Sequence, residues 1–124
     1  MPPVNVKVIQ AGDFIRASAL GQVQMDKAEA LLKEIADASA GLENFQVLVD
    51  TRRAVGTLSP TELWHLAGSL AIYRRTFGNR TAILCPFERF DQARFFALCA
   101  ENQGFNVQAF TTYEDAMEWL IASE

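Results

Sequence analysis

Hydrophobic and polar positions repeat along the chain with two different periods. Short apolar runs rich in β-branched residues, such as Phe45-Gln46-Val47-Leu48-Val49-Asp50, are typical of β-strands. Longer segments repeat their apolar positions every three or four residues, which indicates helices with one buried face. In chain order, the patterns predict strands over 4–10 and 14–20, a helix over 26–40, a strand over 45–50, a helix over 60–77, a strand over 80–85, a helix over 90–102, a strand over 106–110 and a final helix after Thr111.

Turn and capping signals set several of these boundaries. Ala11-Gly12-Asp13 predicts a turn that joins the first two strands into an antiparallel hairpin. Ser59-Pro60-Thr61-Glu62 predicts a helix start with a capping box, and Thr111 with Glu114 predicts a second one. The connection over 51–58 is long for an α/β unit, and long connections are more often functional.

The alternation of strands and helices predicts the fold class. The order is β-β-α-β-α-β-α-β-α, and repeated β-α-β units imply mainly parallel strands with right-handed crossovers. We therefore expect an α/β fold with a mixed, mainly parallel sheet of about five strands, an antiparallel N-terminal edge strand and four helices. At 124 residues, the chain fits a single domain over 1–124.

Several stretches resemble a known family. These are Val47-Leu48-Val49-Asp50-Thr51-Arg52, Phe90-Asp91-Gln92-Ala93-Arg94-Phe95-Phe96 before Gly104-Phe105, and Phe110-Thr111-Thr112-Tyr113-Glu114-Asp115-Ala116-Met117-Glu118-Trp119-Leu120. Together with the order of elements, they resemble the SpoIIAA-like family. That family has the STAS fold, named for sulphate transporters and anti-sigma-factor antagonists, and the resemblance implies this fold for nearly the whole chain.

The resemblance also implies two kinds of function. STAS antagonists carry a phosphorylatable serine or threonine directly after the aspartate that ends the third strand, and these positions match Asp50 and Thr51. Thr51 is thus a candidate phosphorylation site, although Arg53 replaces the small residue of the family pattern and a longer loop delays the next helix. The same fold group includes carriers similar to CRAL-TRIO lipid-binding domains, which implies a lipid-like ligand as the alternative.

Charge is unevenly distributed along the chain and narrows the choice of partners. The formal net charge is −4, but residues 51–100 carry seven arginines and three acids, and the remainder carries four basic and twelve acidic residues. The acidic total argues against a nucleic-acid partner. The arginine-rich middle favours an anionic ligand or an acidic protein surface.

Neither a transmembrane segment nor a signal peptide is recognisable, so we expect a cytoplasmic protein.

The loop after the third predicted strand is the best candidate site. Ligands of open α/β sheets bind beyond the carboxyl ends of the strands, where helix N-termini and arginines both favour anions. The residues that we expect there are Asp50, Thr51, Arg52, Arg53 and Arg89, with Arg94 close to them. The alternative is that these arginines are solvated loop residues paired with nearby acids, and that Asp50 caps the loop. Arg74, Arg75 and Arg80 belong to the opposite edge.

The chain shows no pattern typical of a catalytic or metal centre. His65 is the single histidine and is expected on a helix surface, while Cys85 and Cys99 match no zinc or redox spacing and are expected as buried packing residues. We therefore expect no cofactor, no metal and no enzymatic activity; an enzyme would need Asp50, Thr51 and an arginine to converge.

These observations leave two functional hypotheses. The first is a non-enzymatic STAS-type binding or regulatory module that contacts a protein partner through Asp50 to Arg53. The second is a carrier of a small lipid-like or anionic ligand, suggested by the broad apolar surface of the second and third predicted helices, which includes Trp64, Phe95 and Phe96. Apolar residues on the outer side of the third helix also suggest a homodimer.

Overall fold

The computed structural model describes residues 4–9 and 14–122, with side chains from Ile15 onwards. A five-stranded sheet forms its centre, with the strand order β1-β2-β4-β6-β7. The strands are β1 (Val4–Ile9), β2 (Phe14–Ala19), β4 (Gln46–Asp50), β6 (Arg80–Leu84) and β7 (Asn106–Phe110). β1 pairs with β2 antiparallel, and each of the other neighbouring pairs is parallel. The predicted sheet is therefore confirmed; the predicted turn at 11–13 lies outside the described residues.

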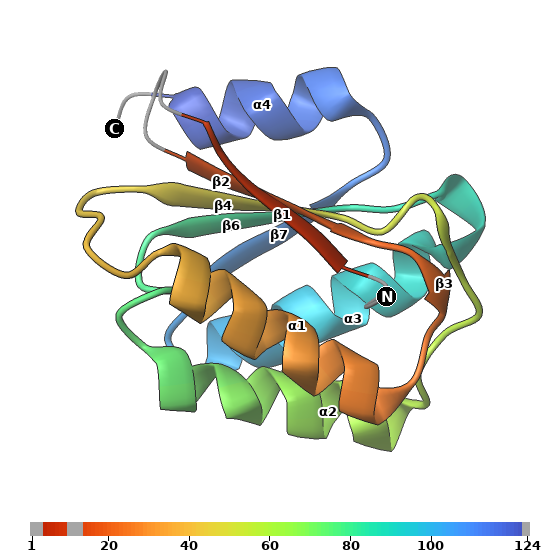
Figure 1. The fold of residues 1–124 in the computed structure, drawn as a ribbon. Coiled ribbons are helices and arrows are strands. Elements are labelled where there is room, and N and C mark those ends of the chain that lie inside the picture. The colour runs from red at the N-terminus through yellow and green to blue at the C-terminus, as the bar shows by residue number, and fades with distance from the viewer. Residues whose placement is uncertain (1–3, 10–13, 123–124) are drawn as a thin grey trace.

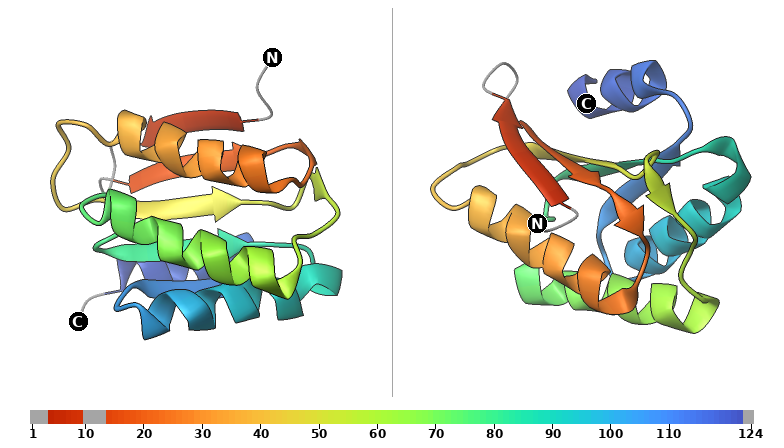
Figure 2. Two further views of the ribbon diagram at one scale, coloured as in Figure 1. Left: turned by 90° about the horizontal axis from the view of Figure 1, so that it is seen from below. Right: turned by 45° about the vertical axis from the view of Figure 1, so that its right-hand side comes forward.

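Helices cover both faces of the sheet (Figure 1). One face carries α1 (Met25–Ala38), α2 (Pro60–Ser69) and α3 (Phe90–Asn102), and the other carries α4 (Tyr113–Ile121). Seen from below, α1, α2 and α3 lie side by side and run roughly along the strands (Figure 2, left). The four predicted helices are all present.

Strand alternation builds a separate apolar core on each face. Val47 and Val49 of β4 pack into the large core beneath α1, α2 and α3, whereas Leu48 between them packs with Leu120 of α4. Successive side chains of a strand point to opposite faces, so an uninterrupted apolar strand can serve two cores. This arrangement explains why the central strand is apolar on both sides.

The second helix is shorter than its apolar pattern predicts. α2 ends at Ser69, and a 3-10 helix, η1 (Leu70–Tyr73), continues the chain. The Ser69 hydroxyl donates to the main-chain oxygen of His65 at 3.2 Å, a local bond that bends helices. The start of α2 is as predicted, because Ser59 and Glu62 form a reciprocal capping box.

The start of the last helix also differs from the prediction. Thr112, not Thr111, is the N-cap of α4, and its hydroxyl accepts a hydrogen bond from the main-chain N–H of Asp115 at 3.2 Å. The spacing of a threonine and an acid three residues later fits both positions, so the pattern alone does not separate them.

Two very short strands were not predicted. β3 (Gly21–Gln22) follows β2 directly, and β5 (Ala54–Val55) lies within the long connection after β4. They pair in parallel as a second, two-stranded sheet, visible in the right-hand view of Figure 2. The 51–58 connection is thereby fixed to the segment that leads into α1. It is also contacted by Arg89 at the end of a short 3-10 helix, η2 (Phe87–Arg89).

Candidate functional site

The end of β4 divides the predicted site between the two faces of the sheet. Asp50 contacts Arg16 and Arg52 on the side of Tyr113 and α4, where the guanidinium of Arg16 lies 5.5 Å from the Tyr113 ring centre. Thr51, the next residue, lines a cavity beneath the opposite face. Adjacent residues of an extended chain point in opposite directions. Asp50 and Thr51 therefore do not share one pocket.

Asp50 is held by a dense set of hydrogen bonds. Its Oδ1 accepts from the main-chain N–H of Arg52 at 3.0 Å and from Nε at 3.1 Å, and its Oδ2 accepts from Arg52 Nη2 at 2.9 Å and Arg16 Nη2 at 3.2 Å. Burial by itself raises the pKa of Asp50, but the bonds and charge of Arg52, helped by Arg16, lower it below its ordinary value. The carboxylate therefore caps the loop, one of the two roles weighed from the sequence.

Arg89 fixes the loop from the opposite side. From the end of η2, its Nη1 donates to the main-chain oxygens of Ala54 at 2.7 Å and Gly56 at 2.9 Å, and its Nη2 donates to that of Thr51. A planar guanidinium presents several donors in a fixed arrangement, so one side chain can bind several main-chain oxygens of the loop at once. Arg89 acts here as a brace of the loop.

Thr51 is anchored to β6. Its main-chain N–H and its hydroxyl both donate to the main-chain oxygen of Leu84, at 2.7 and 3.0 Å. The residue is half-buried, so its hydroxyl is not freely presented to solvent. Any modification of this oxygen would have to break the bond to Leu84 first.

The remaining arginines separate into different surroundings. Arg53 is exposed at the tip of the loop and makes no hydrogen bond or ion pair within the described residues. Arg94 lies away from it, in a groove between α3 and β7. At the opposite edge, Arg75 donates to the Leu42 oxygen at 3.2 Å, and Arg80 donates to the Trp119 and Ala122 oxygens at the end of α4. Arg80 thus binds the C-terminal end of the last helix.

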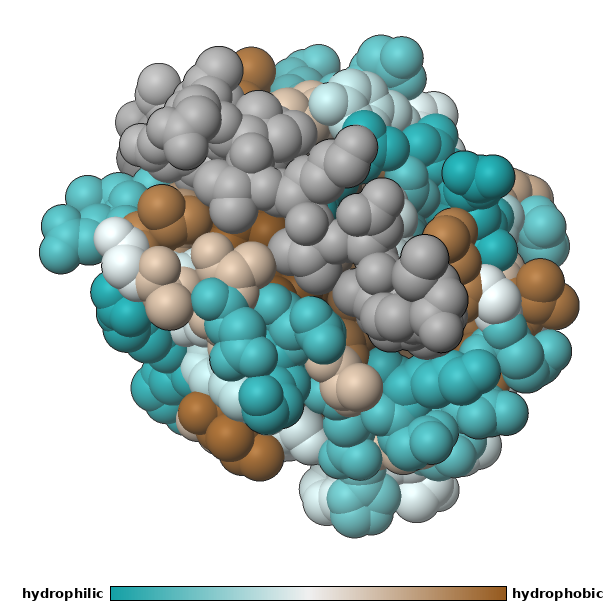
Figure 3. Space-filling view, viewed as in Figure 1, coloured by the Kyte–Doolittle hydropathy of each residue, from teal (hydrophilic) through white to brown (hydrophobic). Residues whose placement is uncertain are grey.

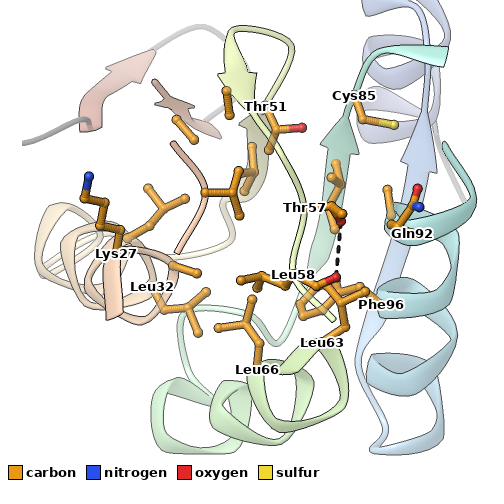
Figure 4. Close-up of a pocket in the computed structure, with 18 of the residues that line it drawn as sticks. Lys27, Leu32, Thr51, Thr57, Leu58, Leu63, Leu66, Cys85, Gln92 and Phe96 are labelled. Carbon is orange, nitrogen blue, oxygen red and sulfur yellow. Dashed lines mark hydrogen bonds between the residues drawn. The ribbon is translucent and has the colours of Figure 1, made fainter. Parts of the chain in front are cut away.

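A largely apolar cavity lies behind the loop and was not located from the sequence. It has a volume of about 180 Å³ and lies between the sheet and helices α1, α2 and α3 (Figure 4). Its walls include Leu32, Leu63, Leu66 and Phe96, and the loop from Thr51 to Leu58 covers one side. The carrier hypothesis required a pocket, and this cavity meets that requirement, although Trp64 is 55% exposed and lies outside it.

The cavity has few polar groups, and two of them are notable. Thr81 Oγ1 and Gln92 Oε1 are buried without a hydrogen-bond partner, and both residues line the cavity. Neither residue carried much signal in the sequence, because Thr81 directly follows Arg80 and Gln92 directly follows Asp91. Lys27 also lines the cavity from α1 and is half-buried.

The expected surface position of one residue and the expected burial of two others are confirmed. His65 is exposed on α2 with its ring against the edge of Trp64, 5.1 Å between centres. Cys85 and Cys99 are free, buried thiols, and burial raises the pKa of Cys85.

Within residues 4–9 and 14–122, no cluster of His, Cys, Asp and Glu could hold a metal ion. Over the same residues, no helix combines the length and apolar character needed to cross a membrane.

Comparison with known proteins identifies the fold. No protein-family model matches the chain, and no curated protein matches it. Several solved structures do. One is an uncharacterised protein with a SpoIIAA-like fold from Shewanella loihica, with 22% identity, a TM-score of 0.59, and coverage of 94% of this chain and 91% of that one. Another is an anti-sigma factor antagonist from Mycobacterium paratuberculosis, with 17% identity, a TM-score of 0.61, and coverage of 96% and 95%.

These likenesses confirm the fold that the sequence resemblance implied. The chain has the SpoIIAA-like, STAS-type α/β fold over almost its full length. At such low identities the likeness extends to the fold alone, because one fold supports many functions. The function has to be argued from the site.

Proposed function

We propose that the protein is a non-enzymatic binding module of the STAS type that contacts a protein partner through the loop from Asp50 to Arg53. The observation that carries this proposal is the rigid mounting of the loop. Asp50 and Arg89 hold it from opposite sides, while Arg53 remains exposed and without a partner among the described residues. A braced loop loses little conformational entropy on binding.

The charge of the loop indicates the kind of surface that it would meet. Arg52 keeps 41% of its side chain exposed despite its ion pair, and Arg53 is next to it. Two neighbouring guanidinium groups favour an acidic partner surface, and such contacts weaken as salt is added. One of the structures that share the fold is an anti-sigma factor antagonist, which supports a binding role over a catalytic one.

A charge reversal with a matched control tests the proposal. Arg53→Glu and Arg75→Glu change the net charge equally, but Arg75 lies at the opposite edge of the sheet. Proteins crosslinked to the chain in its own cells should include at least one whose recovery falls with Arg53→Glu and not with Arg75→Glu. If Arg53→Glu, Arg52→Ala and Thr51→Ala all leave every crosslinked protein unchanged, the interaction surface lies elsewhere.

Thr51 stays the candidate regulatory residue of this surface. A phosphate on its hydroxyl would replace the bond to Leu84 and add negative charge on the cavity side of the loop, where Arg89 binds the Thr51 main-chain oxygen. We expect phosphorylation to loosen the loop and to weaken an acidic partner's binding. Intact-mass measurement of protein from its own cells, followed by peptide mapping, would detect the modification; an unmodified Thr51 under all growth conditions would exclude this regulation.

The cavity favours a second candidate function, a small-ligand carrier. An apolar space of about 180 Å³ exceeds the engineered cavity of about 150 Å³ that binds benzene. Intact mass under native and then denaturing conditions tests this role. Extra mass that is lost on denaturation would identify a bound ligand, and a bare mass in both would count against a tightly held one.

Self-association through α3 is a further part of the proposal. Leu98 and Phe95 on its outer side are 56% and 38% exposed. Elsewhere, in the lower part of the face shown in Figure 3, hydrophilic residues predominate and apolar ones form small separate patches. Light scattering of wild type and Leu98→Glu tests this contact: a monomer at high concentration in both would refute it.

A further inference from the structure

Two buried polar side-chain atoms without a hydrogen-bond partner among the described residues belong to residues that line the same cavity. Thr81 is only 4% exposed, and its Oγ1 lacks a hydrogen-bond partner, as does the buried Oε1 of Gln92. Both residues line the cavity beneath the sheet. A buried hydroxyl or amide oxygen without a partner is unfavourable, and such groups are rare in native proteins. Their coincidence with an apolar cavity indicates that a bound molecule, an ordered water or a ligand, supplies the missing bonds.

Strand geometry explains how Thr81 comes to face this space. Thr81, Ile83 and Cys85 alternate with Ala82 and Leu84, and the first three line the cavity while the other two pack beneath α4. A hydrophobic residue at position 81 would fill the same volume without an unsatisfied group. The threonine is therefore costly in the empty cavity and useful only when its hydroxyl is matched.

The chemistry of the wall limits what could match it. Thr81 can donate and accept a hydrogen bond, whereas Gln92 Oε1 only accepts. The two unsatisfied groups are uncharged, and burying an unpaired ion among apolar walls is far more costly than burying a hydroxyl. A neutral group that both donates and accepts, such as a hydroxyl, can match either residue.

We propose that the cavity binds an uncharged, mainly apolar molecule of about six to nine non-hydrogen atoms that carries one hydroxyl group, recognised by Thr81 or Gln92. This inference rests on the second candidate function and gives that carrier its ligand class. Lys27 provides the contrasting possibility, an anionic head, because it lines the cavity and has no ion pair among the described residues.

Three probes of similar size separate these possibilities: benzyl alcohol, toluene and benzoate, titrated by NMR. Benzyl alcohol is better hydrated than toluene, so a purely apolar cavity would prefer toluene. We expect benzyl alcohol to bind at least as tightly as toluene and benzoate to bind most weakly. Thr81→Val keeps the side-chain shape, and it or Gln92→Leu should shift the ratio of the two neutral dissociation constants by roughly fivefold or more towards toluene.

Controls give each outcome a separate meaning. Ala93→Leu places extra volume at the cavity wall and should abolish binding of both neutral probes. If toluene binds but neither Thr81→Val nor Gln92→Leu changes the ratio, hydroxyl recognition is wrong while the carrier stands. If benzoate binds most tightly and Lys27→Ala weakens it, the ligand is anionic and the proposal is wrong. If no probe binds to a wild-type protein that melts cooperatively, both the ligand class and the carrier role fall.

Discussion

Arg52 encloses the carboxylate of Asp50, two residues before it, with three hydrogen bonds: one from its main chain and two from its guanidinium. The main-chain bond fixes the turn of the loop. The side-chain bonds compensate the negative charge of Asp50, which is only 6% exposed. One aspartate thus sets both the shape and the charge of the candidate interaction surface.

The Asp50–Arg52 pair should make stability depend on pH in the acidic range. The pKa of Asp50 is lowered in the folded protein, so its contribution is fully present above the unfolded value of about 3.9 and is lost as pH falls through the folded value. We expect Asp50→Asn to reduce the free energy of unfolding at pH 7 by about 1–2 kcal/mol. The difference from wild type should shrink below about pH 4 in urea titrations.

An exposed ion pair provides the control. Asp37 pairs with Lys33 at 3.0 Å, with side chains 64% and 66% exposed. Asp37→Asn should change stability by less than about 0.5 kcal/mol. A difference between wild type and Asp50→Asn that stays constant from pH 7 to below pH 3 would show that the carboxylate is not the stabilising group.

Replacing Arg89 should loosen the loop without changing its charge. Lysine keeps the cation but cannot reach the oxygens of Thr51, Ala54 and Gly56 from one planar group. We expect Arg89→Lys to cost about 1–3 kcal/mol and to speed amide exchange over 51–58 more than over β6. Uniform acceleration across the whole sheet would mean that Arg89 supports the fold in general.

A buried hydroxyl pair should couple α1 to the chain after η1. The Ser39 hydroxyl donates to the Ala36 oxygen at 2.8 Å and lies 3.1 Å from that of Thr76, so Thr76 is the donor between them. Thr76→Val should destabilise by about 1–2 kcal/mol, since it leaves Ser39 without its donor. In a double-mutant cycle with Ser39→Ala, the combined loss should be smaller than the sum. Strict additivity would contradict the coupling.

Two glycines with the same backbone angle allow the contact between β3 and the loop to be measured. Gly56 and Gly41 both have φ of +86°, but a Cβ on Gly56 would lie 2.6 Å from Gln22 Nε2, whereas one on Gly41 would meet nothing within 4 Å. Each alanine substitution should cost about 1 kcal/mol of backbone strain. The Gln22 amide ends an exposed, flexible side chain and can turn away. The strain at Gly56 falls beside Val55, however, so Gly56→Ala should in addition accelerate amide exchange at Val23, whose N–H donates to the Val55 oxygen. Equal amide exchange at Val23 in the two variants would show that Gly56 does not affect the contact between β3 and the loop.

The main sheet and its helices could be predicted because periodicity reports burial directly. Val47, Leu48 and Val49 are apolar in succession, and the strand is indeed covered on both faces. The early end of α2 could not be predicted this way, because its apolar stripe continues beyond Ser69 while the hydrogen-bond pattern changes. Periodicity does not distinguish an α-helix from a following 3-10 turn.

The structure brings some of the predicted loop residues together, but in an arrangement that the sequence did not indicate. Asp50, Arg52 and Arg89 do bear on the same loop, but as its braces, because each guanidinium finds an oxygen close by. The cavity depends on the volume that three helices leave unfilled, which no local pattern contains. β3 and β5 were missed because two residues are too few to show an alternation.

The two-residue pairing of β3 with β5 has a kinetic consequence. These segments are far apart in the chain and can meet only after β2 and β4 have paired, since that pairing brings them to one edge. Such a small sheet contributes few bonds of its own, so the cover of the cavity stays closed chiefly through the Arg89 bonds, and we expect it to open when these break together. A molecule could thus enter and leave through transient detachment of this corner while the rest of the protein stays intact.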